Sequence, residues 1–593
     1  MEHDPIVLSG DEYASDASSE TLDHDTSRIA SPGPSNSPSL NETIDLTGSA
    51  ALSESEDSSD ECFEVPCDHW NAIIHAARTQ APEELRPARQ LEEFCLDGIV
   101  YKAGQSVQLF DDTFLRIRSV WEEPKGAIFF KGRRLISTKA HDGTYIPKWD
   151  NELVWISNEE TDIPLAIVRR FVSIHFTNHC HTSRDPKKAS QGDHLFCRLK
   201  EVLERNKTSV EYLTYDEADI GYRVASKSLR WEWRGSTSPF GSEARTNPPV
   251  IVLDEDDDHH RHESDLTRDQ KMRRKYTFGD GFCGAGGVSC GAEMAGLSVK
   301  WAFDLSPHAI ATYSLNFPMA DRHISDAYHF FLNNEEGLRV DVTHGSPPCQ
   351  TFSPAHTIPS ANDDNNSACI FSCGNLIRKI RPRIHTMEET SGLSERHKET
   401  LHAVIHDFLE TGFSVRWAVL KCMDYGVPQL RKRLIIIASG PGETLPALPK
   451  PTHGPPSSGL QEIVTINQAI ANIPPGTPDH DIEGAQSRGY QREPFDGDTQ
   501  ARTITCGGGE NNYHPSGRRL YTNRELACLQ TFPIDFKFGR REVRKQIGNA
   551  VPPLLAKAIY VEIIKSLQET DEREMGENRE TTDDGHMLCE VYS

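Results

Sequence analysis

The stretch Asp341–Thr357 reads DVTHGSPPCQTFSPAHT and places Cys349 between a proline pair and a glutamine. Pro347 and Pro348 fix φ and remove two backbone donors, which stiffens the approach to the thiol. A free cysteine is more often a small buried hydrophobe than a nucleophile. The sequence around this stretch therefore has to decide between the two interpretations.

Five further blocks surround this stretch. A glycine-rich turn, FGDGFCGAGGVSCG, occupies Phe278–Gly291, and MEET at Met387–Thr390 carries two carboxylates after a strand candidate. Val427–Ser439 reads VPQLRKRLIIIAS, Ala501–Thr505 reads ARTIT, and Gln546–Pro553 reads QIGNAVPP. A lone glycine-rich loop is a weak signal, whereas six ordered motifs form a strong one.

In this order and at this spacing the blocks resemble the cytosine-C5 DNA methyltransferase family over residues 275–566. The resemblance implies S-adenosylmethionine as the cofactor and double-stranded DNA as the substrate. The same half of the chain alternates short apolar runs, Gly/Asp-rich turns and helical stretches, which is typical of a doubly wound α/β sheet. In such folds ligands bind beyond the carboxyl ends of the strands.

The glycines of the first block allow a tight turn and a close approach of the backbone to a cofactor. Asp304 follows about twenty residues later, where an acid can accept hydrogen bonds from ribose hydroxyls. Alone, this pattern also fits a dinucleotide site. By the resemblance, Phe282 packs on the adenine of S-adenosylmethionine, Asp304 binds the ribose and Asp326 lies near the adenine amino group. The cofactor-binding positions that the resemblance implies are Phe282, Gly284, Gly286, Gly287, Asp304, Asp326, Pro348, Asn549 and Val551.

Cytosine C5 is too poor a nucleophile to attack a methyl sulfonium, so a thiolate must first add to C6 of the ring. The resemblance gives that role to Cys349, and gives Glu388 the carboxyl group that bonds to N3. Arg431 and Arg433 would steady the flipped base and lower the pKa of the thiol. Extruding the base costs a few kcal/mol. The implied substrate-binding positions are Gln350, Ser353, Gln429 and Thr503.

The chain departs from the family at Glu388-Glu389-Thr390, where the usual block is Glu-Asn-Val. A second carboxylate beside the first can raise a pKa or change the contact with the cysteine loop. This variant and the short interval 440–498, where the family places its target-recognition region, resemble the fungal RID-like subgroup. That subgroup is associated with repeat-induced silencing and premeiotic methylation.

The net charge of -26 is concentrated in three segments. Residues 1–66 contain 16 acids and one Arg, residues 254–258 read DEDDD, and residues 568–593 contain nine acids and two Arg. The remaining sequence is therefore nearly neutral. We predict disordered acidic tails at 1–66 and 567–593 and a linker at 236–274.

Three short β-prone segments beside acidic residues resemble SUMO-interacting motifs, which add a strand to a partner's sheet. They are Ile6–Leu8, Ile44–Thr47 and Val250–Leu253. A chance cluster in disordered chain explains the first two equally well. Lys271–Lys275 is a nuclear-localisation candidate. Chromatin or SUMO-modified partners and a nuclear location are the resulting expectations.

Residues 67–235 form the expected second module. A helix or two is predicted up to Phe94, followed by short strands that argue for a small β-barrel or sandwich. Together with ELVWIS and HLFCRL, this region resembles a bromo-adjacent homology (BAH) module. Interleaved aromatic and basic residues at 209–238 fit either nucleic-acid stacking or the packed edge of the module. The predicted strands are Val107–Phe110, Leu115–Ile117, Ala127–Phe130, Leu153–Ile156 and Phe171–Ile174.

Other classes of protein are not favoured. The His and Cys residues at 175–197 show no clean ligand pairs, so we expect no metal. No apolar run approaches the ~20 residues of a membrane span. Two alternatives to an active DNA methyltransferase stay open. One is a catalytically silent chromatin scaffold with the same fold, and the other is an RNA cytosine methyltransferase.

Overall fold

The computed structural model describes residues 87–141, 149–157, 162–180, 194–204, 207–235, 275–333, 337–348, 352, 368–488, 491–506 and 512–589. All of them belong to one compact unit, Arg78–Ser593. The segment 1–66, the linker 236–274 and the three SUMO-type segments lie outside the described residues. Cys349, Gln350 and Ser353 also lie outside them.

The second half of the chain forms a mixed sheet with strand order β15-β14-β13-β16-β17-β19-β18. All neighbouring pairs are parallel except those made by β19, which is antiparallel to β17 and β18. The expected doubly wound α/β class is therefore confirmed. The strands are β13 (Thr277–Gly281), β14 (Ser298–Asp304), β15 (Asp321–Ile324), β16 (Val342–Gly345), β17 (Ile384–Thr390), β18 (Ser414–Lys421) and β19 (Lys432–Ser439).

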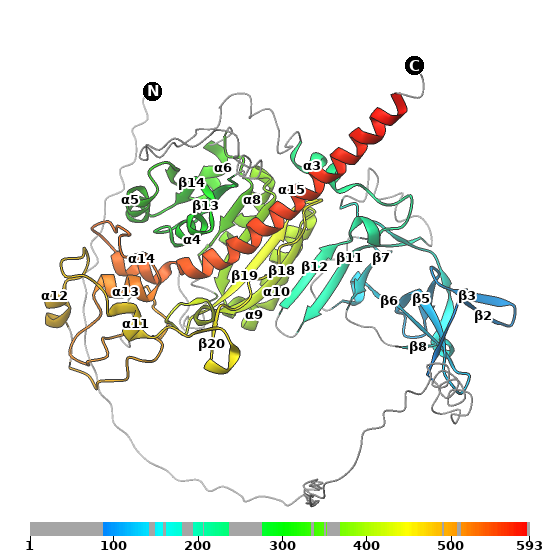
Figure 1. Cartoon of the computed structure of the whole chain (residues 1–593), viewed down its shortest axis with the longest axis horizontal. Coiled ribbons are helices and arrows are strands. Elements are labelled where there is room, and N and C mark those ends of the chain that lie inside the picture. The colour runs from blue at the N-terminus through cyan, green and yellow to red at the C-terminus, as the bar shows by residue number, and fades with distance from the viewer. Residues whose placement is uncertain are drawn as a thin grey trace, which may run out of the picture. The chain divides into compact units, whose positions relative to one another are not determined.

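Helices cover both faces of this sheet (Figure 1). Alternation along the strands divides the core, because Ile435 and Ile437 pack in one cluster and Leu434 and Ile436 in the other. The helices are α4 (Gly287–Ala295), α5 (Pro307–Asn316), α6 (Ala327–Asn333), α8 (Ser372–Ile380), α9 (Gly392–Arg396), α10 (Lys398–Glu410), α11 (Ile466–Ile470), α12 (Ile482–Ser487), α13 (Asn523–Leu529), α14 (Val543–Asn549) and α15 (Pro553–Cys589). The interval 440–498 also holds the two-residue strands β20 (His453–Gly454) and β21 (Gln461–Glu462).

The N-terminal module is mainly β, and four of the five strands predicted from its sequence are present. It ends with a helix, α3 (Ser226–Arg234). Its strands are β1 (Arg89–Leu91), β2 (Glu93–Leu96), β3 (Ile99–Lys102), β4 (Ser106–Leu109), β5 (Phe114–Glu122), β6 (Ile128–Ser137), β7 (Glu152–Ile156), β8 (Ile163–Pro164), β9 (Val168–Val172), β10 (Ile174–Phe176), β11 (Leu195–Glu204) and β12 (Lys207–Tyr212). The fifth prediction, Phe171–Ile174, spans the end of β9 and the start of β10, with a break at Ser173.

The predicted helix before Phe94 is wrong over the described part of that segment, which holds the strands β1 and β2. The hairpin of β2 and β3 turns at Asp97 and Gly98, both of which have positive φ (52° and 80°). Asp-Gly is a strong signal for this kind of turn, and it outweighs the helical spacing of the preceding apolar residues.

The two modules share one continuous sheet. β12 pairs antiparallel with β18, with Val210 opposite Val415. This pairing covers the edge strand of the α/β sheet, which would otherwise expose its backbone donors and acceptors. Tyr212 lies in this contact and donates its hydroxyl to the carbonyl of Leu409 at 2.7 Å. The packed-edge interpretation therefore holds for Tyr212.

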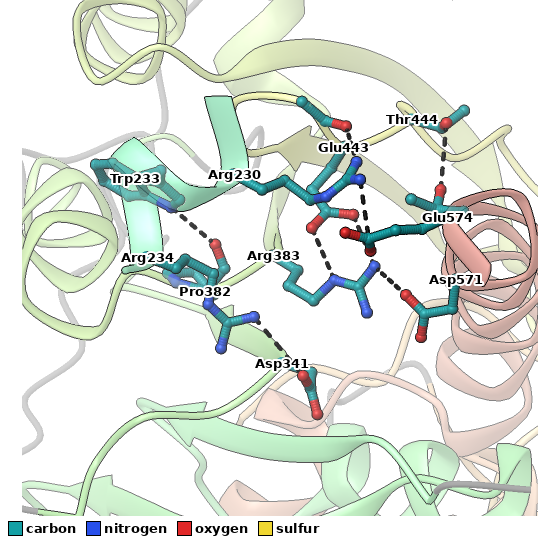
Figure 2. Close-up of polar contacts among 12 residues, drawn as sticks. Arg230, Trp233, Arg234, Asp341, Pro382, Arg383, Glu443, Thr444, Asp571 and Glu574 are labelled. Carbon is teal, nitrogen blue, oxygen red and sulfur yellow. Dashed lines mark hydrogen bonds and ion pairs between the residues drawn. The ribbon is translucent and has the colours of Figure 1, made fainter. Parts of the chain in front are cut away.

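Helix α3 binds the α/β domain through a network of ion pairs (Figure 2). Arg234 pairs with Asp341 at 3.7 Å, and the indole of Trp233 donates to the carbonyl of Pro382 at 3.1 Å. Arg230 lies 3.5 Å from Glu574 and donates to the carbonyl of Gly442 at 2.6 Å. Trp233, in the second half of the 209–238 segment, is thus part of an internal interface.

The same network corrects the predicted tail at 567–593. Helix α15 continues through this boundary, and Asp571 is buried where it pairs with Arg383 at 2.7 Å. Arg383 also forms a double hydrogen bond with Glu443, at 2.8 and 2.9 Å. Acids that read as a solvated tail are therefore partners for buried arginines, a pairing that sequence composition does not reveal.

One helical stretch among the described residues, Val543–Met575, is long and apolar enough to cross a membrane by length and composition alone. From the sequence we expected no apolar run of this length. Leu555, Ile559 and Ile563 of this stretch are buried in the core against the sheet. Its apolar face is thus accounted for by packing within the domain.

Candidate active site

The predicted cofactor residues gather at the carboxyl ends of β13 and β14. These strands are parallel neighbours, and Gly281 at the end of β13 pairs with Phe303. The glycine-rich turn follows β13 directly, and Asp304 ends β14. Two segments about twenty residues apart therefore meet at one edge of the sheet, as a nucleotide-type site requires.

The turn is built from residues with left-handed backbone. Phe282 has φ of 58°, an uncommon and strained value for a bulky side chain, and its ring packs edge-on against Phe303 at 5.3 Å. Gly286 has φ of 95° and caps the start of α4, and a Cβ there would overlap the ring of Phe317. Glycine is needed at this position for both conformation and space.

Asp304 is held in place by two backbone donors. The amide of Gly284 donates to its Oδ2 at 2.9 Å, and the amide of Ser306 donates to its Oδ1 at 2.8 Å. Burial raises the pKa of this carboxyl, although the two amides and Lys545 oppose the rise. A Cβ at Gly284 would meet no atom within 4 Å, so open space lies beside the carboxylate.

The other predicted cofactor positions surround this edge. The carboxylate of Asp326 accepts the backbone amide of His329 at 2.8 Å, which holds its pKa below the usual range. A Cβ at Gly287 would overlap the carbonyl oxygen of Val551, so the C-terminal block closes on the turn. Asn549 is exposed at the end of α14, and Pro348 is half-buried beyond β16.

Glu388 and Arg433 form a buried ion pair at the carboxyl end of β17, with Oε1 and Nε 2.5 Å apart. Their exposed fractions are 7% and 11%. The register explains the contact, because Arg433 on β19 stands opposite Thr390, which lies on the same face of β17 as Glu388. A carboxylate and a guanidinium that are in contact and shielded from solvent form a preorganised polar pair.

Arg431 has a different environment from Arg433, although the sequence groups them. It is buried, and its guanidinium donates to the carbonyls of Ile504 at 3.0 Å, Gly548 at 3.2 Å and Ala550 at 3.1 Å. It therefore ties the segment before β19 to two of the other sequence blocks. These contacts support a positioning role for Arg431, and its predicted contact with a flipped base stays a prediction.

Gln429, a predicted substrate-binding residue, belongs to a neighbouring network of buried hydrogen bonds. Its side chain is fully buried, and its Oε1 accepts the amide of Ile504 at 2.9 Å. Its Nε2 donates to Gln530 at 2.7 Å, and Gln530 in turn donates to the carbonyls of Ile547 and Ala550. Gln429 therefore holds the blocks together, and its predicted contact with substrate stays a prediction.

Thr503 is half-buried beside this network, and its hydroxyl lies 3.4 Å from the carbonyl of Leu430. The remaining predicted substrate residues, Gln350 and Ser353, and the nucleophile candidate Cys349 lie outside the described residues. Their assignment stays a prediction from sequence.

A family model described as C-5 cytosine-specific DNA methylase matches residues 276–484 and 477–565. Residues 276–565 of this chain belong to that family. This methylase domain contains every block of the sequence analysis, and its members use S-adenosylmethionine, which is therefore the cofactor.

Similar proteins cover about half to two thirds of this chain. The type II methyltransferase M1.HphI of Haemophilus parahaemolyticus is 29% identical over 332 residues, which are 49% of this chain and 87% of that protein. The type II methyltransferase M.Sau96I of Staphylococcus aureus is 26% identical over 423 residues, 63% of this chain and 94% of that protein. Among solved structures, the S. pombe Dnmt2 methyltransferase has 16% identity and a TM-score of 0.36, and covers 50% of this chain and 99% of that one.

The residues at the glycine turn of the methylase domain fit S-adenosylmethionine. The cofactor has ribose hydroxyls and an ammonium group, and Asp304 offers acceptors next to the open space at Gly284. Asp304, Phe282 and the backbone of the turn would hold it. When bound there, the cofactor supplies an electrophilic methyl group.

Asp280, which sequence reasoning missed, lies at the base of the turn in β13. It is fully buried, its Oδ2 accepts the hydroxyl of Ser289 at 2.6 Å, and its Oδ1 has no hydrogen-bond partner in the described part of the chain. Burial raises the pKa of this carboxyl to about 7. An acid between two glycines inside an apolar strand is the signal that could have drawn attention to it.

Glu389, the residue that departs from the family's block, is fully buried on the opposite face of β17 from Glu388. The backbone amide of Thr390 donates to its Oε2 at 3.1 Å, while Oε1 has no hydrogen-bond partner among the residues that the structure describes. Burial and the charge of Glu388 raise the pKa of Glu389 well above its usual range. Glu389 therefore holds its proton more tightly in the folded state than in the unfolded state.

We expect the stability of Glu389→Gln relative to wild type to increase as the pH rises from acidic to neutral. The pKa of Glu389 is higher in the folded state than its value of 4.5 in the unfolded state. The free energy of unfolding of the wild type therefore falls as the pH rises from 4.5 towards the folded-state pKa. The slope is about 1.4 kcal/mol per pH unit. Urea unfolding at about pH 5 and about pH 8 measures the difference.

The exposed Glu399→Gln on α10 is the matched control and should change little at either pH. A stability gap between wild type and Glu389→Gln that stays constant from acidic to neutral pH would contradict a raised pKa of Glu389.

Proposed function

We propose that this chain methylates C5 of cytosine in double-stranded DNA through a covalent adduct of Cys349 with C6. The observation that carries the proposal is the buried Glu388–Arg433 pair, which lies on the same carboxyl edge of the sheet as the glycine turn. Membership of the methylase family supports the reaction class. The description of the family model as a DNA methylase supports DNA as the substrate, and the relatives are named type II methyltransferases.

In this mechanism the thiolate of Cys349 forms a carbon–sulfur bond with C6, and the electrons of the C5–C6 double bond move towards C5. Glu388 bonds to N3 of the ring and stabilises the resulting enamine, while Arg433 fixes the orientation of the carboxyl group. After C5 is methylated, a base removes its proton and the carbon–sulfur bond breaks, which returns the thiolate.

Covalent trapping tests the proposal. The full chain is mixed with S-adenosylmethionine and a duplex that carries 5-fluorocytosine, whose fluorine blocks the final elimination. We expect a stable protein–DNA adduct with wild type and none with Cys349→Ser. Cys95→Ser, an exposed cysteine in the N-terminal module, is the matched control and should retain the adduct.

The same experiment separates the alternatives. Cofactor binding without any adduct on DNA would favour a catalytically silent scaffold, for which the uncommon buried Glu389 is the supporting observation. An adduct that forms only on fluorinated RNA would favour an RNA methyltransferase.

We also propose de novo methylation of repeats in the nucleus during sexual development, with a BAH-like module that contacts chromatin or SUMO-modified proteins. The support is the sequence resemblance to the fungal RID-like subgroup, together with the β-rich architecture of residues 87–235. Methylation assays on repeated and single-copy duplexes of equal cytosine content test the first part. Titration with SUMO, observed by NMR, tests the last.

A further inference from the structure

The hairpin between β11 and β12 lies at the catalytic edge of the sheet, although it belongs to the N-terminal module. β17 and β18 are both antiparallel to β19, so they run in the same direction. β12 is antiparallel to β18, with Thr208 opposite Trp417 and Val210 opposite Val415. The start of β12, at Lys207, therefore points towards the carboxyl end of β18, the edge that carries Glu388.

This placement is fixed by contacts on both sides of the module. Main-chain pairing of β12 with β18 holds one side, and Figure 1 shows β11 and β12 continuing the sheet next to β18. The ion pairs of Arg230 and Arg234 in α3 hold the other side (Figure 2). Buried pairs of this kind are costly to break, so the hairpin keeps its position relative to the catalytic edge.

Two exposed lysines stand directly opposite each other at this edge. Lys421 at the end of β18 and Lys432 at the start of β19 are cross-strand partners, and like charges in such a pair repel. No salt bridge to either lysine is found among the described residues. Two acids lie close by. Burial raises the pKa of the Asp424 carboxyl, and the positive charge of Lys421 opposes that rise. Glu388 is already paired with Arg433.

Lys207 stands at the same end of β12 in the other module. Its neighbour Thr208 pairs with Trp417 and so shares the sheet face of Lys421 and Lys432, which places Lys207 on the opposite face, that of Glu388. The side chain of Lys207 is 52% exposed and makes one solvent-exposed contact with Glu204, at 3.6 Å. Such exposed pairs contribute little, so the charge is available to a partner. We call these three lysines, Lys207, Lys421 and Lys432, the basic edge: they lie at one end of β12, β18 and β19, on both faces of the sheet and in both modules.

We propose that this basic edge binds the phosphate backbone of the DNA duplex, so that the N-terminal module is part of the substrate-binding surface. The inference rests on the proposed function. A polyanion relieves the repulsion between Lys421 and Lys432, and the edge adjoins the Glu388–Arg433 pair. The interval 440–498 is short for a target-recognition region, and contacts from the other module compensate for its small surface.

The salt dependence of DNA binding tests this inference. Each phosphate contact that is lost reduces the slope of log K against log salt concentration by about 0.9. We expect Lys207→Gln to reduce the slope by about one contact and the triple variant Lys207→Gln/Lys421→Gln/Lys432→Gln by two to three contacts. The binding constant is measured by fluorescence anisotropy with a labelled duplex, using the full chain.

Two exposed lysines away from this edge are matched controls, Lys102→Gln on β3 and Lys557→Gln on α15. Both should keep the wild-type slope. Affinity for S-adenosylmethionine should be unchanged in every variant, which shows that the fold is intact.

The outcomes separate the two proposals. If wild type binds DNA and forms the 5-fluorocytosine adduct but the triple variant keeps its slope, the basic edge is wrong and the enzyme function stands. If the slope falls for the triple variant but not for Lys207→Gln, the proposed role of the N-terminal module is wrong. If wild type neither binds DNA nor forms an adduct, the proposed function fails first.

Discussion

Glu388→Gln is expected to lower the rate of DNA methylation by about 100- to 1,000-fold, the loss that follows removal of a preorganised electrostatic contact. The amide cannot share a proton with N3 of cytosine, and its neutral oxygen attracts Arg433 less than the carboxylate 2.5 Å away. Single-turnover methylation with the full chain and saturating DNA measures the chemical step.

Binding of S-adenosylmethionine provides the internal control for this variant. Its affinity should change little, because Glu388 lies on β17, whereas Phe282 follows β13 and Asp304 ends β14. Glu399→Gln on α10 should retain the wild-type rate. A Glu388→Gln protein that methylates DNA at the normal rate would remove Glu388 from the mechanism.

Arg431→Ala is expected to lower the free energy of unfolding by about 3–5 kcal/mol, a loss at the upper end for a single substitution. Its guanidinium binds carbonyls of Ile504, Gly548 and Ala550 in a fully buried place. Each buried carbonyl left without a donor costs about 1–3 kcal/mol. Urea unfolding followed by tryptophan fluorescence measures the change.

Arg502→Ala, an exposed arginine close in sequence, is the matched control and should change stability by less than about 0.5 kcal/mol. Arg431→Lys should recover only part of the loss, because an ammonium cannot reach the same set of carbonyls with a planar fork. Equal stability of Arg431→Ala and wild type would show that the carbonyls find other donors.

The sequence was sufficient for the features that depend on local order. Strand ends in a parallel sheet meet at one edge, so the spacing between the glycine turn and Asp304 predicted their proximity. Short apolar runs between turn residues predicted four strands of the N-terminal module, and merged the ends of β9 and β10 into a fifth. Both inferences use the periodicity of a single segment and a general rule of sheet topology.

Features that depend on partners far away in sequence were missed. Gln429 reads as a polar residue beside a catalytic strand, and only its contacts with Ile504 and Gln530 show that it belongs to the core. Asp571 reads as part of an acidic tail until Arg383 is seen next to it. Nothing in a local pattern specifies which distant group satisfies a buried polar side chain.

The pairing of β12 with β18 has a consequence for the order of folding. The two strands are separated by about two hundred residues, so the ribosome releases β12 long before its neighbour exists. At typical synthesis rates of about 5–20 residues per second, the β12 edge stays open for about ten seconds or more. An unpaired edge of this kind is where nascent chains join one another, and a fragment starting near residue 275 would expose the complementary edge of β18 permanently. Chaperone demand during synthesis should thus fall sharply once residue 421 has left the exit tunnel.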